Sequence, residues 1–282
     1  MGPLSPAAIR RLAARHGIRP RRSLGQHFLI EPSLARRIVE LAGVRPGSRV
    51  LEVGAGLGSL TMALAEAGAD VVALEVDPKL VPALSEAVAP FGNRVRVVVA
   101  DAMDADWAAI LGPEGAEWAM VANLPYNVAT PVVVRALESE PRIRRLLVMV
   151  QREVGERLAA RPGDGQFGGV SLRVAYWAEA KVVRRVPASV FWPRPQVESV
   201  LVSLVRHAPP VAADRERLFT VIRVSFAERR KTMRSAMIRL GVDRAVAAGV
   251  LEACGIAPNA RPEELGLAEF GCLTERLSEG PE

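Results

Sequence analysis

Three glycines at alternate positions, Gly54, Gly56 and Gly58, directly follow the short apolar run Arg49–Val53. Such a run predicts a strand, and the apolar spacing over residues 59–67 predicts a helix behind the glycines. At a strand-to-helix turn, glycines let the backbone pass close to a ligand and let the helix pack on the strand. The chain is therefore constrained to an α/β fold with a ligand loop at the carboxyl end of a core strand.

Strands and helices alternate beyond this loop. Apolar runs predict strands at residues 49–53, 70–75, 95–99, 118–122 and 146–150, and helical periods fall at residues 59–67, 79–88, 130–137 and 151–160. Two further runs, 181–186 and 199–205, flank a proline-rich turn and predict an antiparallel pair at the edge of the sheet. We expect an α/β, Rossmann-like domain whose mixed, mostly parallel sheet is covered on both faces.

A change of pattern divides the chain near His207-Ala208-Pro209-Pro210, which is typical of a linker. Beyond it the periodicity is helical, with expected helices from Asp214 to Phe226, over residues 231–240 and over residues 243–254. We expect residues 1–207 to form the α/β domain with a basic N-terminal extension. Residues 208–282 then form a small all-helical domain.

Composition excludes several classes of protein. Half of the residues are hydrophobic and 24% are charged, which is ordinary for a globular chain. Only two cysteines, Cys254 and Cys272, and three histidines occur, so we expect structural cysteines, no disulfide framework and no metal site. No apolar run approaches the ~20 residues that span a bilayer. The first twenty residues lack the apolar core of a secretory signal, so we expect a cytoplasmic protein.

The net charge of +6 is unevenly distributed. Residues 1–45 carry a charge of +7, residues 46–140 carry −8, residues 141–207 carry +7, and residues 208–282 are neutral. An acidic centre between basic segments suits a small cationic or neutral cofactor held in one part and a polyanion met by a basic rim. An arginine-rich solvated surface is the other interpretation of the same pattern.

Carboxylates stand at the ends of three successive predicted strands, and they indicate the kind of cofactor. Glu52 is placed to meet an amine or a positive charge, Glu75 can accept hydrogen bonds from ribose hydroxyls, and Asp101 can accept one from an adenine amine. The glycine spacing G-x-G-x-G lacks one residue of the dinucleotide fingerprint, and a pyrophosphate would be repelled by these carboxylates. S-adenosylmethionine carries the groups that this arrangement favours.

The tetrapeptide Asn123-Leu124-Pro125-Tyr126 follows the fourth predicted strand. The Asn123 side-chain oxygen and the Leu124 or Pro125 carbonyl can bind both N–H groups of a nucleobase amine and aim its lone pair at a sulfonium methyl group. Tyr126 would stack on a base that has left its own stack, and Phe191 would cover the other face. Ordinary loops also carry such tetrapeptides, but its place in the strand order favours methyl transfer.

With these motifs in this order, the sequence resembles the ribosomal RNA adenine N6-dimethyltransferases, in particular the bacterial small-subunit KsgA/RsmA family. The resemblance covers nearly the whole chain. It rests on Leu24-Gly25-Gln26-His27-Phe28-Leu29, the Glu52–Gly58 loop, Glu75, Asp101, Asn123–Tyr126, the Phe-x-Pro-x-Pro-x-Val-x-Ser stretch at 191–199, and Phe226 with Arg229-Arg230-Lys231. His27 stands where many relatives carry Asn.

The resemblance implies a class I methyltransferase domain that uses S-adenosylmethionine, followed by a helical domain. It implies dimethylation of two adjacent adenosines in the 3′-terminal hairpin loop of 16S rRNA. The expected catalytic residues are Asn123, Leu124, Pro125, Tyr126 and Phe191. The expected cofactor-binding residues are His27, Leu29, Gly54, Gly56, Glu75, Asp101, Ala102 and Asn123.

Basic residues mark the expected RNA contacts, although for each cluster a solvated helix face is the alternative. These residues are Arg21, Arg22, Arg144, Arg145, Arg229, Arg230, Lys231 and Arg234. The expected partner is 16S rRNA within the 30S ribosomal subunit or its precursor, bound by a monomer. The alternatives are a 23S rRNA adenine N6-methyltransferase of the macrolide-resistance type, a DNA adenine methyltransferase, and a small-subunit assembly checkpoint in which catalysis is secondary.

Overall fold

The computed structural model describes residues 4–21, 24–112, 115–228 and 231–279. The chain packs as two compact units. The first, which we call the sheet unit, contains residues 1–155 and 180–206. The second, the helical unit, contains residues 156–179 and 207–282. The helical unit therefore takes in a segment, 156–179, that the sequence pattern grouped with the α/β domain.

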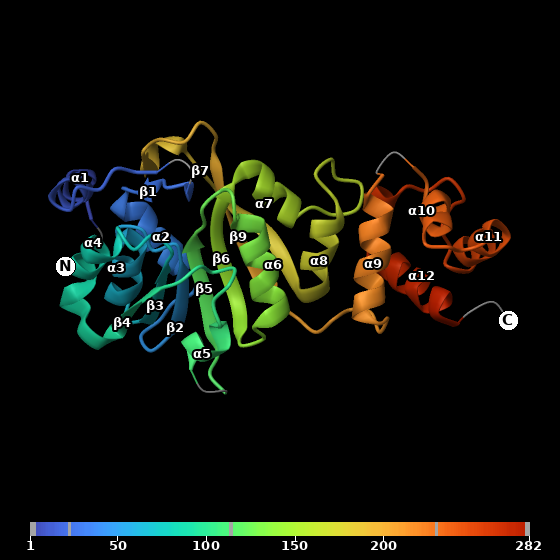
Figure 1. Ribbon diagram of the computed structural model, residues 1–282, viewed down its shortest axis with the longest axis horizontal. Coiled ribbons are helices and arrows are strands. Elements are labelled where there is room, and N and C mark those ends of the chain that lie inside the picture. Colours follow the sequence, from blue (N-terminus) through green and yellow to red (C-terminus); the bar gives the residue numbers. More distant parts are fainter. Residues whose placement is uncertain (1–3, 22–23, 113–114, 229–230, 280–282) are drawn as a thin grey trace. The chain divides into compact units, whose positions relative to one another are not determined.

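A seven-stranded sheet with the strand order β4-β3-β2-β5-β6-β9-β7 forms the core of the sheet unit (Figure 1). Its strands are β2 (Arg49–Val53), β3 (Asp70–Glu75), β4 (Val95–Val99), β5 (Trp118–Asn123), β6 (Ile143–Gln151), β7 (Ala178–Val186) and β9 (Ser199–Arg206). The strands from β4 to β6 pair in parallel, whereas β9 runs antiparallel to β6. The predicted mixed, mostly parallel sheet is confirmed. A separate antiparallel pair joins β1 (Phe28–Leu29) to β8 (Phe191–Trp192).

Helices flank this sheet (Figure 1). The helices that begin in the sheet unit are α1 (Pro6–Arg15), α2 (Pro32–Leu41), α3 (Ser59–Glu66), α4 (Val81–Val88), α5 (Trp107–Leu111), α6 (Ala129–Ser139) and α7 (Arg152–Leu158), with short 3-10 helices at Ala89–Arg94 and Ala188–Val190. Four of them, α3, α4, α6 and α7, match the predicted helices to within a few residues. Helices α1, α2 and α5 were not predicted.

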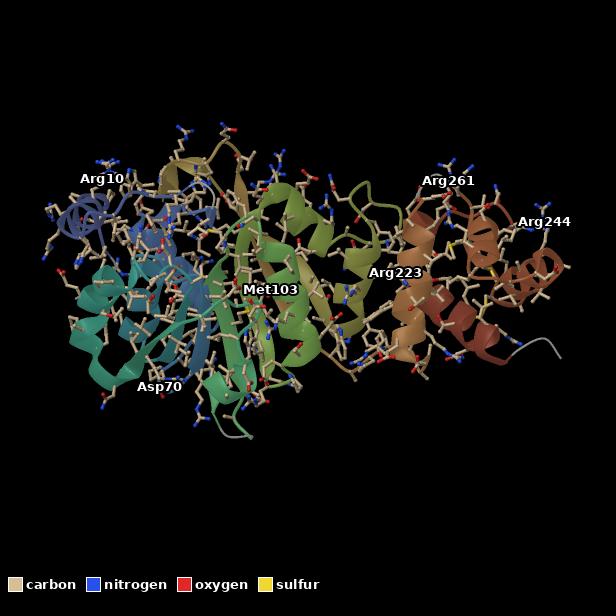
Figure 2. The ribbon with its side chains drawn as sticks, viewed as in Figure 1. Arg10, Asp70, Met103, Arg223, Arg244 and Arg261 are labelled. Atoms are coloured by element: carbon tan, nitrogen blue, oxygen red, sulfur yellow. A yellow bond between two sulfur atoms is a disulfide. The ribbon has the colours of Figure 1, made fainter. Side chains whose placement is uncertain are left out.

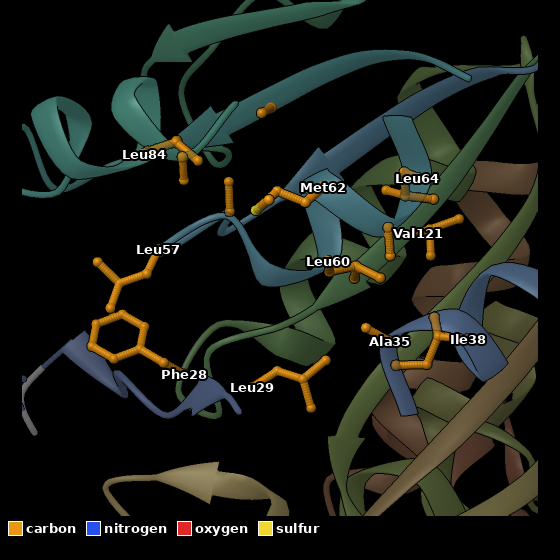
Figure 3. Close-up of a cluster of buried hydrophobic side chains, with 14 of the residues drawn as sticks. Phe28, Leu29, Ala35, Ile38, Leu57, Leu60, Met62, Leu64, Leu84 and Val121 are labelled. Carbon is orange, nitrogen blue, oxygen red and sulfur yellow. The ribbon is translucent and has the colours of Figure 1, made fainter. Parts of the chain in front are cut away.

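The central strands are buried along almost their whole length. In β2, for example, only Arg49 is exposed and the other four residues are buried. Parallel strands covered on both faces need this continuous apolar character. Side chains from β1, the glycine loop, α2, α3 and α4 meet in one cluster, to which Phe28, Ile38, Leu57, Leu64 and Leu84 belong (Figure 3). The loop after β2 is thus anchored in the core of the unit.

The helical unit has its own core, with Phe167, Leu218, Met237, Leu251 and Phe270 almost completely buried. Its helices are α8 (Gly169–Trp177), α9 (Arg215–Phe226), α10 (Met233–Arg239), α11 (Arg244–Ala253) and α12 (Leu267–Glu279), with a 3-10 helix at Pro262–Glu264. Arg223 on α9 and Arg244 on α11 are exposed (Figure 2). The predicted start of α9 is confirmed, because the Asp214 side chain accepts a hydrogen bond from the amide of Arg217.

Cys254 and Cys272 form a disulfide whose Cα atoms lie 5.8 Å apart. It links the end of α11 to the middle of α12. The sequence predicted structural cysteines and no disulfide framework, and it missed this single disulfide because the two residues lie 18 positions apart and meet only in the folded chain. Over the described ranges, no cluster of His, Cys, Asp and Glu could hold a metal ion. No helix in those ranges is long and apolar enough to cross a membrane.

Candidate active site

The glycine loop between β2 and α3 is held by the neighbouring strand. The amides of Gly54 and Ala55 both donate to the carbonyl of Leu74 on β3, at 2.8 and 3.1 Å. Gly54 and Gly56 have φ angles of 77° and 58°, which side chains rarely adopt. A Cβ atom on Gly56 would also lie 3.0 Å from the ring of Phe28. Glycine is therefore required at this turn for both backbone conformation and space.

Glu75, at the end of β3, ties this loop down. Its Oε2 accepts a hydrogen bond from the amide of Gly56 at 2.8 Å, and its Oε1 accepts one from the amide of Asp77 at 2.9 Å. Burial raises the pKa of the Glu75 carboxyl above its usual value, and these two amides oppose the rise. Because each carboxylate oxygen has a second lone pair, Glu75 can still accept bonds from two hydroxyl groups of a ligand.

Glu52, at position four of β2, is a buried acid without a full set of partners. Only 1% of its surface is exposed, and its Oε2 has no hydrogen-bond partner among the described residues. Burial, with a smaller contribution from the charge of Glu75, raises the pKa of Glu52 from 4.5 to about 8. Ser59, at the start of α3, likewise has a buried hydroxyl with no partner in the described part of the chain. Both residues line the same pocket and can serve a ligand there.

The Asn123–Tyr126 turn closes the pocket at the end of β5. The Asn123 Nδ2 donates to the His27 carbonyl at 3.0 Å, which leaves the amide oxygen for another donor. The Pro125 carbonyl accepts from the amide of Val128 at 3.1 Å. The Tyr126 hydroxyl lies 2.8 Å from the Ser199 hydroxyl, and its ring lies 5.3 Å from the ring of His27. Burial raises the pKa of Tyr126, so the phenol stays neutral.

One pocket thus brings together most of the predicted catalytic and cofactor-binding residues. These are His27, Leu29, Gly54, Gly56, Glu75, Asn123, Leu124, Pro125 and Tyr126, with Glu52 beside them. His27 is held by a 2.7 Å hydrogen bond between its Nδ1 and the carbonyl of Pro193. Because a carbonyl only accepts, Nδ1 carries the proton.

Three predicted residues do not line this pocket. Asp101 follows β4, is exposed, and accepts a hydrogen bond from the Met103 amide at 2.7 Å. Ala102 is buried, and its carbonyl accepts bonds from the side chains of Trp107 and Arg135. Phe191 is only 3% exposed because it lies in β8 and packs in the core of the sheet unit. The position of Phe191 therefore gives no support to its stacking on a base.

The predicted RNA-binding residues have varied surroundings. Arg144 and Arg145 are exposed on β6, and Arg144 lies 3.8 Å from Glu117. Lys231 is exposed, and half-buried Arg234 donates to the Arg244 carbonyl at 3.3 Å. Arg21 forms an ion pair with Asp77 at 2.5 Å. Arg22, Arg229 and Arg230 lie outside the described residues.

Sequence reasoning missed several residues that line the pocket. Val76, which is 45% exposed, and Ser59 were not singled out, and Gln26 was noted only as part of a motif. Gly25 is also close to the tetrapeptide, since a Cβ atom there would lie 3.2 Å from the Tyr126 amide. For Val76 a signal was present, because a residue directly after the acidic strand end lies at the same edge of the sheet.

Residues 17–278 match the sequence model of the family described as ribosomal RNA adenine dimethylase. The chain belongs to this family. Among its relatives, the ribosomal RNA small subunit methyltransferase A of Thermobifida fusca strain YX is 47% identical over 277 residues, which are 96% of this chain and 95% of that protein. The protein of the same name from Cutibacterium acnes is 43% identical over 99% of this chain and 95% of its own.

Two solved structures share the fold of this dimethylase family member. A dimethyladenosine transferase from Plasmodium falciparum superposes with a TM-score of 0.76 at 22% identity, covering 90% of this chain and 98% of its own. The 23S rRNA methyltransferase ErmE superposes with a TM-score of 0.68 at 27% identity, covering 89% of this chain and 99% of its own. The predicted class I methyltransferase fold is confirmed.

Replacing Glu52 tests whether its carboxyl group titrates at a raised pKa. Between the ordinary pKa of an unfolded glutamate and the folded value of about 8, the folded state holds more protons than the unfolded state. In the wild type, the contribution of Glu52 to the free energy of unfolding therefore decreases as the pH rises through this window. Glu52→Gln removes the effect, so at pH 8 its thermal unfolding midpoint should exceed that of the wild type by roughly 2 °C or more.

The gain should be small near pH 5, grow up to about pH 8 and then stop growing. Thermal unfolding followed by circular dichroism at several pH values measures it. Glu66→Gln, on the exposed face of α3 and 3.8 Å from Arg36, is the control for removing a carboxyl group outside the buried site. A Glu52→Gln effect of equal size at pH 5 and pH 8 would contradict the buried titration.

Proposed function

We propose that this protein transfers methyl groups from S-adenosylmethionine to N6 of two adjacent adenosines in the 3′-terminal hairpin loop of 16S rRNA. The observation that carries the proposal is the 47% identity with a small subunit methyltransferase A over nearly the whole of both chains. The family membership and the pocket at the carboxyl ends of β2, β3 and β5 support the same chemistry.

The described pocket residues fit S-adenosylmethionine. Glu52 Oε2 and Ser59 Oγ are buried polar atoms that need partners, and the amino-acid part of the cofactor offers them. Glu75 would accept the ribose hydroxyls, and Asp101, which lies outside the described pocket lining, would accept the adenine amine. When bound, the cofactor supplies an electrophilic methyl group on a sulfonium. The positive charge of the sulfonium is favoured by the carboxylates around it.

The target amine would be held by two neutral acceptors of the Asn123–Tyr126 turn. The Asn123 amide oxygen faces one N–H group, because its Nδ2 is occupied by the His27 carbonyl. The Pro125 carbonyl already accepts from Val128, so the Leu124 carbonyl is the better candidate for the second N–H group. Binding both hydrogens this way directs the nitrogen lone pair toward the methyl group and places the reactants for in-line transfer.

Tyr126 would stack on the adenine ring. Its hydroxyl is fixed by Ser199, so the ring is presented at a defined angle beside the two acceptors. A hairpin-loop adenosine can be splayed out of its stack and read in this way, whereas paired RNA is recognised mainly by shape and phosphates. These residues therefore suit a single-stranded target.

For the RNA backbone, basic residues that are exposed or half-buried in each unit are the candidate contacts. They are Arg144 and Arg145 in the sheet unit, and Lys231 and Arg234 in the helical unit. Each would meet phosphate oxygens of the RNA through charge-assisted hydrogen bonds. We further propose that a monomer acts in the cytoplasm on the 30S subunit or its precursor.

A second candidate, methylation of 23S rRNA, is supported by the similarity to ErmE at 27% identity. The fold and the cofactor pocket suit both substrates. The small-subunit substrate is favoured because the identity to the Thermobifida fusca protein is far higher, 47% against 27%, with similar coverage of this chain.

Methylation of isolated subunits tests the substrate. Purified protein is incubated with S-adenosylmethionine and undermethylated small or large ribosomal subunits, and the digested RNAs are analysed by mass spectrometry. We expect N6,N6-dimethyladenosine in the small-subunit RNA alone. Its appearance only in large-subunit RNA would favour the ErmE-like alternative, and its absence from both would overturn the proposed reaction.

Asn123→Ala separates catalysis from subunit binding. Removal of the amide oxygen takes away one of the two acceptors, so we expect methylation to fall at least a hundredfold. Binding to small subunits, measured by co-sedimentation, should stay within about twofold because RNA contacts are spread over the basic surface. Loss of subunit binding in this variant would contradict the separation, and unchanged methylation would contradict the role of Asn123.

The two arginines of β6 can be tested by charge reversal. Arg144→Glu with Arg145→Glu should weaken binding to small-subunit RNA and reduce the slope of log affinity against log salt by roughly 0.7 to 0.9 per lost phosphate contact. Fluorescence anisotropy at several salt concentrations measures both quantities. The control is Arg37→Glu on α2, which reverses one exposed charge. An unchanged slope would remove this pair from the interface.

A further inference from the structure

One wall of the pocket is a short stretch of chain that comes before the sheet. All six residues from Leu24 to Leu29 line the pocket, and we call them the wall segment. Its last residues are fixed by the strand pair β1–β8 and by the amide of Ile30, which donates to the Val190 carbonyl at 2.9 Å. Together with the two hydrogen bonds of His27, to Pro193 and Asn123, these contacts hold the wall segment from His27 onward.

The other end is held by Asp77. This side chain is 3% exposed and accepts hydrogen bonds on Oδ2 from Arg21 Nη2 at 2.5 Å and from Gln26 Nε2 at 2.9 Å. The Gln26 side-chain oxygen in turn accepts from the Arg21 amide at 2.8 Å. Asp77 Oδ1 accepts from the Lys79 amide at 3.1 Å. The carboxylate is thus shared between the wall segment and the chain after β3.

Asp77 also connects to the part of the pocket that meets the ribose. Its amide donates to Glu75 Oε1, while Glu75 Oε2 holds the Gly56 amide. Bonds therefore run without a break from Arg21 and Gln26 through Asp77 and Glu75 to the glycine loop. Burial favours the neutral form of Asp77, but the bonds from Arg21 and Gln26 outweigh it and hold its pKa below the usual value.

We infer that Asp77 is a positioning residue which, through Arg21 and Gln26, fixes the wall segment against Glu75 before S-adenosylmethionine binds. The inference rests on the proposed function in one respect, namely that this pocket takes that cofactor. In this arrangement Arg21 holds the protein's own wall segment through Asp77, whereas its charge alone predicted an RNA contact. Asp77 itself does not line the pocket and touches no reacting atom.

The physical effect of such positioning is preorganisation. Without Asp77, the start of the wall segment would keep only the backbone bonds from Leu24 and Gln26 to the Arg21 carbonyl, and cofactor binding would then have to order it. Hydrogen bonds to a charged group that is mostly buried are among the stronger ones in proteins. Losing the Arg21–Asp77 bond should therefore weaken cofactor affinity roughly tenfold, with little change in the rate of transfer once both substrates are saturating.

The test uses the full-length protein without RNA. Arg21→Met, Asp77→Asn and the double variant are compared with wild type by isothermal titration with S-adenosylmethionine. Hydrogen exchange of peptides covering residues 24–29 is measured in the absence of cofactor. The matched control is Arg15→Met, which breaks a 2.6 Å ion pair with Glu86 in the same N-terminal region but away from the pocket.

We expect both single variants to raise the Kd roughly tenfold and to speed exchange in the wall segment. The double variant should be no worse than Asp77→Asn alone, because that change already removes the charge that Arg21 meets on Asp77. Arg21→Lys, which keeps the charge, should recover part of the affinity. The Arg15→Met control should match wild type in both measurements.

Wild-type Kd and exchange rates in Arg21→Met and Asp77→Asn would overturn the inference, as would fully additive effects in the double variant. Should Asp77→Asn fail to fold, Arg21→Met and Arg21→Lys alone decide, since Arg21 is 44% exposed. If the wild-type protein binds no S-adenosylmethionine, the proposed function fails. The exchange data still decide whether Asp77 holds the wall segment.

Discussion

The hydrogen bond from the Gly56 amide to Glu75 Oε2 is the contact on which the pocket depends. It joins the loop after β2 to the end of β3, and the parallel pairing of these strands brings the two into reach. The loop can follow this path only because glycines accept its positive φ angles and leave room for Phe28. Backbone conformation, strand order and the buried carboxylate are therefore parts of one arrangement, and a change in any of them alters the others.

The carboxyl groups of Glu52 and Glu75 determine the electrostatics of the pocket. Glu52 and Glu75 are buried close to each other, and no Lys or Arg occurs among the described residues that line the pocket. A buried carboxylate without a cation is unfavourable, which is why the pKa of Glu52 rises to about 8. A cationic ligand would relieve this cost, whereas a pyrophosphate would increase it. The electrostatics thus favour a cationic ligand, such as the sulfonium of S-adenosylmethionine, over one that carries phosphates.

Much of the fold and of the site could be predicted from the sequence, because both depend on local patterns. Three strands have the predicted bounds, namely Arg49–Val53, Asp70–Glu75 and Val95–Val99. The pocket lies at the glycine loop, as predicted. Contacts between distant segments could not be predicted. Asp77 bonds to Arg21, which lies 56 positions earlier in the sequence, and the disulfide joins the end of α11 to α12. Sequence pattern alone likewise does not show that Phe191 is buried by pairing with Leu29, since a turn aromatic is as easily exposed.

With the target amine held as proposed, the two neutral acceptors of the Asn123–Tyr126 turn would also explain why the reaction stops after two methyl groups. An unmodified adenosine offers N–H groups to both acceptors, a monomethylated one offers a single N–H group, and a dimethylated one offers none. Each transfer therefore removes one hydrogen bond and leaves a polar acceptor of the turn unpaired, which is costly where the site is partly buried. Affinity falls step by step, so the intermediate can still bind while the finished product is released. Each transfer would leave a positively charged nitrogen that still carries at least one acidic proton. Loss of one proton to solvent restores the neutral amine, so the turn needs no basic side chain of its own.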